Sequence, residues 1–467
     1  MIPLTLDEIA RITSARLGTA ADPRAVVRGP VVLDSRRVSP GALFAAVPGE
    51  RADGHDFAAA AVAGGAVAVL ASRPLAVPAI ITGSVPDALA AMARAVIGRL
   101  PAVTIAGITG SSGKTTTKDL TAQLVERLGP TVAPEGSYNN ELGHPLTVLR
   151  ADERTRYMVL ELSARGAGHI AKLCRIAPPK LGAVLNVGHA HAGEFGGLDQ
   201  VARAKGELAE ALPPGGVAVL NADDPRVAAM ARRTSARVVT FGLAGAGGEP
   251  GPDFRASGVR LDELGRPAFT LQTGAGSAPV RMALHGEHLV PDALAAAALA
   301  TELGMSLPDV ARGLSGATAR SKWRMEVTRR ADGVTVINDA YNANPESVRA
   351  AIRALRSMAA GGRSFAVLGE MAELGELSRA SHEEAGAVAA AAGIAGLIAV
   401  GEEAAPILTG ARGQRAWHGE AIGVPDGPGA VAALRRMLAP GDVVLVKASR
   451  AAALESVAAQ LLAETAS

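Results

Sequence analysis

The chain has 467 residues, a length that predicts two to four domains. Hydrophobic residues make up 48% of the chain and aromatic residues only 3%, so its cores must be built mainly from Ala, Val, Leu and Ile. The formal net charge is +2 and no block of like charges occurs, which argues against a nucleic acid or a membrane surface as partner.

The first hundred residues read as a region of their own. They are rich in turn formers, as in Asp34-Ser-Arg-Arg37 and Pro48-Gly-Glu50. We predict that residues 1–100 form a separate N-terminal domain.

The next part of the chain alternates between short apolar runs and longer Ala-rich segments. Val/Ile/Leu runs that end in Gly, Asn or Asp are typical of buried parallel strands. Such runs lie at Val103–Ile108, Tyr157–Leu162, Leu181–Val187, Val217–Asn221 and Val238–Phe241. Helices are expected over Thr116–Leu128 and Ala293–Ala300, and further strands before Leu284. The pattern predicts a central α/β domain over residues 101–314.

A second series of apolar runs follows at Val334–Asn338, Phe365–Leu368, Leu397–Val400 and Val443–Val446. It predicts a C-terminal, Rossmann-like domain over residues 315–467. The predicted fold class is therefore α/β, with three domains and parallel sheets in the second and third.

The cysteine content, the N-terminal residues and the apolar runs together indicate the cellular compartment of the protein. Cys174 is the single cysteine, which excludes a disulfide framework and argues against a Cys-based metal site, so we interpret it as a packing residue. Residues 1–8 lack the basic start and apolar run of a signal peptide. No uncharged apolar run reaches the roughly 18 residues of a transmembrane helix. These features predict a cytoplasmic protein without membrane insertion.

The strongest local motif is a glycine-rich loop between a predicted strand and a predicted helix. Residues 107–117 read Gly-Ile-Thr-Gly-Ser-Ser-Gly-Lys-Thr-Thr-Thr. Backbone N–H groups of such a loop point at phosphate oxygens, Lys114 would reach the β- and γ-phosphates, and the Thr115 hydroxyl would ligate Mg²⁺. The residues predicted to bind the nucleotide here are Gly110, Ser111, Ser112, Gly113, Lys114, Thr115 and Thr116.

The loop alone leaves the reaction open. Its spacing departs from the common phosphate loop because Ile108 stands where the first Gly is expected. The chain lacks the N/T-K-x-D motif with which GTPases read the base, so ATP is the predicted nucleotide. Kinases, motors and ligases all remain compatible with the loop.

One further residue suits metal chemistry, and the rarity of lysine gives a separate signal. Glu161 lies at the end of a predicted strand, at the sheet edge where ligands bind in such folds, and its carboxylate suits Mg²⁺. Only seven of the 47 basic residues are lysines, and Lys205 is one of them. In so Arg-biased a chain, a surviving lysine marks a place where an amine is needed.

Several motifs in order down the chain resemble the Mur ligase family, enzymes that add amino acids or a dipeptide to UDP-N-acetylmuramic acid. They are the T-G-x-x-G-K-T loop, Tyr138-Asn-Asn-Glu-Leu-Gly-His-Pro145 and Asn338-Asp-Ala-Tyr-Asn-Ala-Asn-Pro345. The resemblance implies ATP contacts for Asn140, Arg324, Asp339, Tyr341 and Asn342. Arg324 would contact the γ-phosphate and Asp339 the ribose.

The same resemblance implies a second metal site. In residues 185–196 the family places a metal-binding His, which aligns best with His191 and less well with His189. In Ala202-Arg-Ala-Lys-Gly-Glu207 the family's lysine is carbamylated, and here that lysine is Lys205. Thr115, Glu161, His191 and the Lys205 carbamate would thus hold two Mg²⁺ ions. Lys114, Lys205, His191 and Arg324 are the predicted catalytic residues.

Substrate contacts are implied at both ends of the chain. The stretches around Ser35, Arg36, Asp53 and His55 resemble the family's UDP-binding domain. Leu368-Gly-Glu-Met-Ala-Glu-Leu-Gly375 and the stretch with Lys447 and Arg450 resemble the branch that adds D-alanyl-D-alanine. The substrates implied are UDP-MurNAc-tripeptide, D-alanyl-D-alanine and ATP, the product is UDP-MurNAc-pentapeptide, and a monomer is expected.

Other readings remain open. The family's H-N-x-x-N-A pattern is replaced, with Leu289 and Asp292 at the two Asn positions, which puts adenine contacts there in doubt. The Asp-Asn-Pro-Arg of the diaminopimelate-adding branch is absent from the C-terminal region. A sister ligase adding one amino acid, a folate polyglutamylating enzyme, a non-catalytic ATP-binding scaffold and a P-loop kinase are the alternatives.

Overall fold

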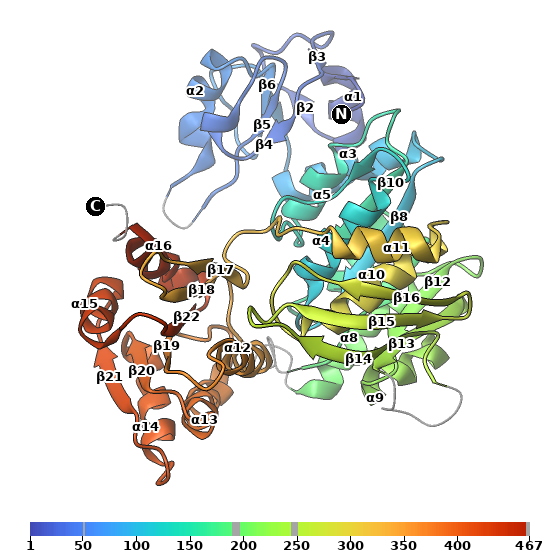
Figure 1. Cartoon of the computed structure of the whole chain (residues 1–467). Helices are drawn as coiled ribbons and strands as arrows, with labels where there is room; N and C mark the ends of the chain where they lie inside the picture. Colours follow the sequence, from blue (N-terminus) through green and yellow to red (C-terminus); the bar gives the residue numbers. More distant parts are fainter. Residues whose placement is uncertain (50–51, 189–196, 244–250, 464–467) are drawn as a thin grey trace.

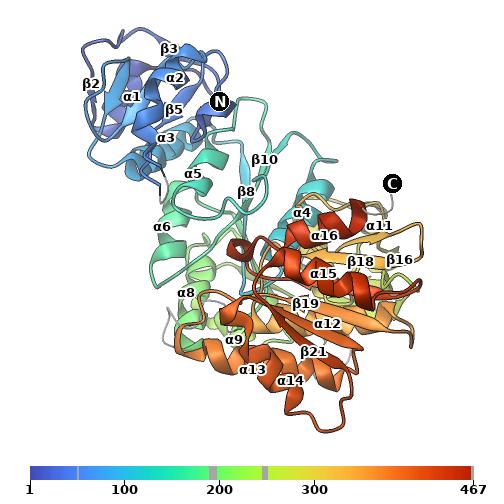
Figure 2. The same ribbon diagram turned by 90° about the vertical axis from the view of Figure 1, so that its left-hand side faces the viewer.

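The computed structural model describes residues 1–49, 52–188, 197–243 and 251–463. It contains three α/β units that follow one another along the chain, as the sequence predicted (Figure 1). Figure 2 shows the N-terminal unit as a separate lobe, with the central unit between it and the orange and red C-terminal unit. In the described part of the chain, no helix is both long and apolar enough to cross a membrane.

The N-terminal unit is a five-stranded sheet of order β2-β7-β6-β5-β4, parallel except for β2. A short ribbon of β1 and β3 stands beside it. Its strands are β1 (Leu4–Thr5), β2 (Arg16–Leu17), β3 (Val26–Val27), β4 (Val31–Val32), β5 (Leu43–Ala45), β6 (Ala68–Ala71) and β7 (Ala79–Ile81). Its helices are α1 (Leu6–Thr13), α2 (Ala58–Ala63) and α3 (Val85–Gly98).

The central unit contains a nine-stranded sheet of order β16-β15-β14-β13-β12-β11-β8-β10-β9, in which only β15 and β16 add antiparallel pairings. Its strands are β8 (Thr104–Thr109), β9 (Thr131–Val132), β10 (Tyr157–Glu161), β11 (Leu181–Val184), β12 (Val217–Asn221), β13 (Arg237–Leu243), β14 (Phe254–Leu261), β15 (Pro267–Thr273) and β16 (Gly276–Arg281). All five predicted strands and the extra strands before Leu284 are therefore confirmed.

Two apolar layers cover the central sheet. The helices of this unit are α4 (Lys114–Val125), α5 (Gly143–Val148), α6 (His169–Ile176), α8 (Leu198–Glu210), α9 (Pro225–Ala228), α10 (Leu289–Glu302) and α11 (Leu307–Ser315). One layer contains α4, α10 and α11, and the Ala-rich α10 is buried along nearly its whole length. The other contains α6 and α8 and continues into α1 and α3 of the N-terminal unit, so these two units share one core.

The C-terminal unit contains a six-stranded sheet of order β17-β18-β22-β19-β20-β21, parallel except for β17. Its strands are β17 (Glu326–Arg329), β18 (Thr335–Asp339), β19 (Ser364–Leu368), β20 (Gly396–Val400), β21 (Glu420–Val424) and β22 (Val443–Lys447). Its helices are α12 (Pro345–Met358), α13 (Ser378–Ala391), α14 (Pro406–Arg412), α15 (Gly427–Met437) and α16 (Glu455–Ala463). Two apolar clusters made only of C-terminal residues fill its core.

Candidate active site

The phosphate loop lies where the order of the central strands reverses. The chain runs from β8 to β10 on one side and returns to β11 on the other, the position at which α/β sheets bind ligands. Gly113 caps α4 with φ +80, a left-handed conformation that favours glycine. A Cβ at Gly113 would lie 2.2 Å from Asp292 Oδ1. The loop therefore needs glycine here for two separate reasons.

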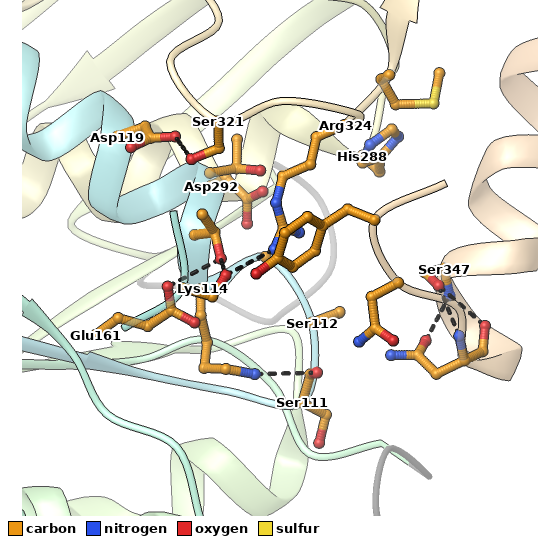
Figure 3. Close-up of a pocket in the computed structure, with 18 of the residues that line it drawn as sticks. Ser111, Ser112, Lys114, Asp119, Glu161, His288, Asp292, Ser321, Arg324 and Ser347 are labelled. Carbon is orange, nitrogen blue, oxygen red and sulfur yellow. Dashed lines mark hydrogen bonds between the residues drawn. The ribbon is translucent and has the colours of Figure 1, made fainter. Parts of the chain in front are cut away.

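Lys114 and Asn186 fix the shape of the loop. Lys114 Nζ donates to Gly110 O at 2.8 Å and to Ser111 O at 3.4 Å, so the side chain folds back over the loop. Figure 3 draws the contact with Ser111. The N–H groups of Ser111 and Ser112 each donate to Asn186 Oδ1 at 2.9 Å. Asn186 follows β11, and the sequence reasoning did not select it, because it lay inside the predicted strand Leu181–Val187.

Three oxygen-bearing side chains meet at the start of α4. Thr115 Oγ1 donates to Glu161 Oε2 at 2.9 Å and also lies 2.9 Å from Ser137 Oγ. Asn139 Nδ2 donates to Glu161 Oε1 at 2.7 Å. Glu161 is the last residue of β10 and is buried. Thr115 and Glu161, which the sequence predicted as magnesium ligands, are thus direct neighbours.

Arg324 reaches this group from the segment that enters the C-terminal unit. Its Nη2 donates to Ser137 Oγ at 3.0 Å, and its guanidinium lies 4.2 Å from the centre of the Tyr341 ring (Figure 3). The stacked and hydrogen-bonded guanidinium is held in one orientation. Ser137, which bridges Thr115 and Arg324, is a residue that the sequence reasoning missed.

A second group of residues gathers at the carboxyl ends of β18 and β22. Lys447 Nζ donates to Asp339 Oδ2 at 2.5 Å and to Asn342 O at 2.8 Å. The other Asp339 oxygen accepts the Met325 N–H at 3.1 Å. Lys447, predicted to bind substrate, therefore contacts the predicted ribose-binding residue here. Its substrate role stays a prediction.

Burial shifts the pKa of several charged groups around the loop. It raises the pKa of Asp292 to about 8, while the nearby Thr117 side chain and the charge of Arg324 oppose the shift. Burial, and next the charge of Lys114, lowers the pKa of Lys205 well below its usual value. The pKa of Lys114 is itself lowered, first by burial, with Glu161 opposing the shift. An amine that burial pushes towards its neutral form is a better nucleophile for CO₂ than an ammonium ion.

The residues predicted in the N-terminal unit lie in two capped turns. The first is a short 3₁₀ turn over Ser35–Arg37. The Asp34 side chain caps it by accepting the backbone N–H of Arg36. The buried His55 lies 2.6 Å from Asp53 through its Nδ1 and accepts the Ser72 N–H through Nε2 at 3.0 Å. Arg450, in the C-terminal unit, stacks 4.5 Å from the centre of the Trp323 ring.

The predicted metal ligand His191 and its alternative His189 fall outside the described residues. Within the described ranges, no group of three or more His, Cys, Asp or Glu side chains is arranged to hold a metal ion. Asn140 lines the cavity, and its side chain accepts the Gly143 N–H at 2.9 Å.

A single cavity of about 660 Å³ joins the two groups of site residues. Its walls come from the phosphate loop, the Ser137 loop, α10, the Arg324 segment and the ends of β18 and β22. It therefore lies between the central and C-terminal units. Except for Gly110, the residues predicted for ATP line this cavity, as do Thr115 and Glu161 of one predicted metal site. The other predicted residues that the structure describes and that are not among its lining residues are Ser35, Arg36, Asp53, His55, Lys205 and Arg450.

Comparison with known proteins agrees with this architecture. Residues 30–110 match the model of the Mur ligase family catalytic domain, residues 108–300 the Mur ligase middle domain, and residues 323–450 the Mur ligase glutamate ligase domain. With relatives more than 30% identical over nearly its whole length, the chain belongs to the Mur ligase family.

Several relatives of high similarity share one name. The UDP-N-acetylmuramoyl-tripeptide–D-alanyl-D-alanine ligase of Mycobacterium tuberculosis is 49% identical, over 99% of this chain and 98% of that protein. The crystal structure of MurF from Acinetobacter baumannii superimposes with a TM-score of 0.87 at 31% identity, covering 99% of both chains. The crystal structure of MurF from Thermotoga maritima in complex with ADP superimposes with a TM-score of 0.80 at 30% identity. This match covers 94% of the present chain and 98% of the other.

Proposed function

We propose that this chain is an ATP-dependent ligase that joins D-alanyl-D-alanine to the terminal carboxylate of UDP-MurNAc-tripeptide, giving UDP-MurNAc-pentapeptide, ADP and phosphate. The observation that carries the proposal is the full-length match, at 49% identity, to a ligase of that name. The cavity supports it, because the phosphate loop, the buried Glu161 and Arg324 face a common space.

ATP would lie between the central and C-terminal units. Lys114 and the first turn of α4 would hold the phosphates, since the unpaired N–H groups of a helix start attract anions. Asp339, Tyr341 and Asn342, at the end of β18, would hold the nucleoside. Arg324 would contact the γ-phosphate, where its fixed guanidinium offsets charge that grows during phosphoryl transfer.

The residues at the start of α4 fit a magnesium ion. Thr115 Oγ1 lies 2.9 Å from both Ser137 Oγ and Glu161 Oε2, and such hydroxyl and carboxylate oxygens are a donor set that suits a hard cation. Thr115 and Glu161 would hold the ion. Bound there, Mg²⁺ would neutralise charge on the phosphate oxygens.

A second metal site would involve Lys205. Its side chain is 3% exposed, and a charged ammonium is unfavourable at such a position. Carbamylation would turn this buried amine into an anionic oxygen ligand, with His191 as its partner. We keep both assignments as proposals, and mass spectrometry of the intact protein under CO₂-buffered, non-acidic conditions tests the carbamate.

The chemistry would proceed in two displacements. A carboxylate oxygen of the tripeptide attacks the γ-phosphorus, ADP leaves, and an acyl phosphate forms. The amine of D-alanyl-D-alanine then attacks the acyl carbon, loses a proton, and releases phosphate as the amide bond forms. Lys114 and Arg324 would stabilise the negative charge in both steps.

We also propose that the enzyme acts as a cytoplasmic monomer. ATP and UDP-linked precursors are cytoplasmic compounds. Sedimentation equilibrium would give the mass of a single chain, and a stable dimer would contradict the proposal.

The decisive test measures phosphate release from ATP with purified protein, Mg²⁺ and UDP-MurNAc-tripeptide. D-Alanyl-D-alanine and a panel of single amino acids are added separately. Release that needs both the tripeptide and D-alanyl-D-alanine, with the pentapeptide product in the mass spectrum, supports the proposal. Release driven by one amino acid would indicate a sister ligase, and no release with any amine would favour an ATP-binding scaffold.

A further inference from the structure

A buried ion pair lies one turn beyond the phosphate-binding residues of α4. Lys118 is 1% exposed and Asp119 is 8% exposed, and their side chains are in contact. Lys118 Nζ also donates to Pro134 O at 2.9 Å, and Asp119 Oδ2 accepts the Ser321 hydroxyl at 2.6 Å (Figure 3). We call Lys118, Asp119 and Ser321 the Lys118 cluster. Through its contacts with Pro134 and Ser321, it ties α4 to two other segments of the chain.

Packing alone does not explain such a cluster. Burying two charges costs hydration free energy, and the attraction between the charges barely offsets that cost. Apolar residues of similar size at the same positions often stabilise a fold equally well. Lys118 is moreover one of only seven lysines in a chain that otherwise uses arginine. The polar contacts of the cluster instead fix the positions of the segments that they join.

Both of those segments lead directly to the active site. Pro134 stands three residues before Ser137, and Ser321 stands three residues before Arg324. Ser137 Oγ and Arg324 Nη2 are 3.0 Å apart, and Ser137 also contacts Thr115. The contacts therefore form a closed ring from α4 through both segments and back to the start of α4.

We propose that the Lys118 cluster is a positioning device that holds Arg324 and Ser137 against the phosphate loop when the C-terminal unit lies over the central unit. Asp119 and Ser321 line the cavity, and their assigned role is to hold Arg324 in place, not to take part in the reaction. The inference rests on the proposed function, because the effect is expressed through the phosphoryl transfer assigned to Arg324.

The same linker offers a matched control. Arg320 makes two hydrogen bonds with Glu126 of the α4 end, at 2.6 and 2.5 Å, but both side chains are about 40% exposed. An exposed ion pair contributes little because water screens it. The Arg320–Glu126 contact ties the same linker to the end of α4. It lies next to the Lys118 cluster but is exposed to solvent, whereas the cluster is buried.

The first experiment compares steady-state phosphate release by Ser321→Ala, Ser321→Thr and Arg320→Gln proteins with the wild type. We expect Ser321→Ala to lower kcat about 10-fold through misplacement of Arg324, with the KM values of tripeptide and D-alanyl-D-alanine within twofold. Ser321→Thr, which keeps the hydroxyl, should recover most of the rate. Arg320→Gln should stay within twofold. Equal losses in Ser321→Ala and Arg320→Gln would overturn the proposal.

The second experiment is a double-mutant cycle with Arg324→Ala. If Ser321 acts through Arg324, adding Ser321→Ala to Arg324→Ala lowers kcat no further. A full additional 10-fold loss would mean a merely structural role and would overturn the inference. If Ser321→Ala gives no folded protein, Asp119→Asn replaces it in the same cycle. A wild-type protein that releases no phosphate would overturn the proposed function itself, which separates the two failures.

Discussion

At the scale of single residues, Glu161 is the side chain on which the magnesium assignment depends. It accepts hydrogen bonds from Thr115 and Asn139 while buried at the end of β10. We expect Glu161→Gln, which keeps the size but removes the charge, to raise the Mg²⁺ concentration at half-maximal rate by at least roughly 10-fold. Titration of phosphate release with Mg²⁺ measures the effect.

The matched control is Glu141→Gln. Glu141 also lines the cavity but is exposed, so this variant removes the same charge from the same space. Its Mg²⁺ dependence should match that of the wild type. If both variants shift equally, the charge of the cavity and not the position of Glu161 determines metal affinity.

Cys174 gives a second prediction at this scale. Burial raises the pKa of its thiol to about 12, with the charge of Glu207 acting in the same direction. Below that value the thiol stays protonated, and only the thiolate reacts with alkylating reagents. Iodoacetamide at pH 8 should therefore leave the native protein unlabelled and label it fully in denaturant. Rapid labelling of the native protein would contradict the structure.

Residue roles could be predicted only where a motif marks them. Lys114, Thr115 and Glu161 stand at strand and helix ends that the sequence reveals, and the structure brings them together. Ser137, Asn186 and Ser321 carry no such mark, because each acts through a contact with a segment distant in the sequence. Contacts of that kind follow from tertiary packing, which no local pattern encodes.

At the scale of elements, the start of α4 can be tested against a helix of the same geometry. Gly113 and Gly168 each cap a helix in the left-handed region, with φ +80 and φ +85. Alanine at either position should cost about 1 kcal/mol of unfolding free energy. Only at Gly113 does the added methyl meet the Asp292 carboxylate, because nothing lies within 4 Å of a Cβ at Gly168.

We therefore expect Gly113→Ala to weaken ATP binding at least roughly 10-fold through displacement of the loop, and Gly168→Ala to leave it unchanged. Calorimetric titration with a non-hydrolysable ATP analogue measures both. Similar affinities in the two variants would mean that the loop accommodates the methyl group, and the requirement for glycine would then be conformational only.

Strands and helices were the easier part of the fold to predict. The Val/Ile/Leu runs at β8, β10, β11 and β12 are buried on both faces, so their composition alone identifies them. The order of strands, the antiparallel addition of β15 and β16, and the shared core of the first two units depend on long-range pairing. The pattern of residues along the chain contains no direct signal for strand order, strand direction or the sharing of a core.

At the scale of the whole molecule, the division of the site between two units implies movement. Substrates must enter a cavity whose walls come from both the central and C-terminal units. We expect binding of a non-hydrolysable ATP analogue and UDP-MurNAc-tripeptide to draw the units together. Small-angle X-ray scattering should show a smaller radius of gyration with ligands than without. An unchanged radius would argue against closure.

The apolar layer that α1 and α3 share with α6 and α8 has a thermodynamic consequence. Because this cluster runs from the N-terminal unit into one layer of the central unit, neither unit can unfold without exposing part of the interior of the other. The C-terminal unit keeps its own interior. Three structural domains should thus melt as two cooperative blocks, and differential scanning calorimetry should resolve two transitions, the larger belonging to the first three hundred residues.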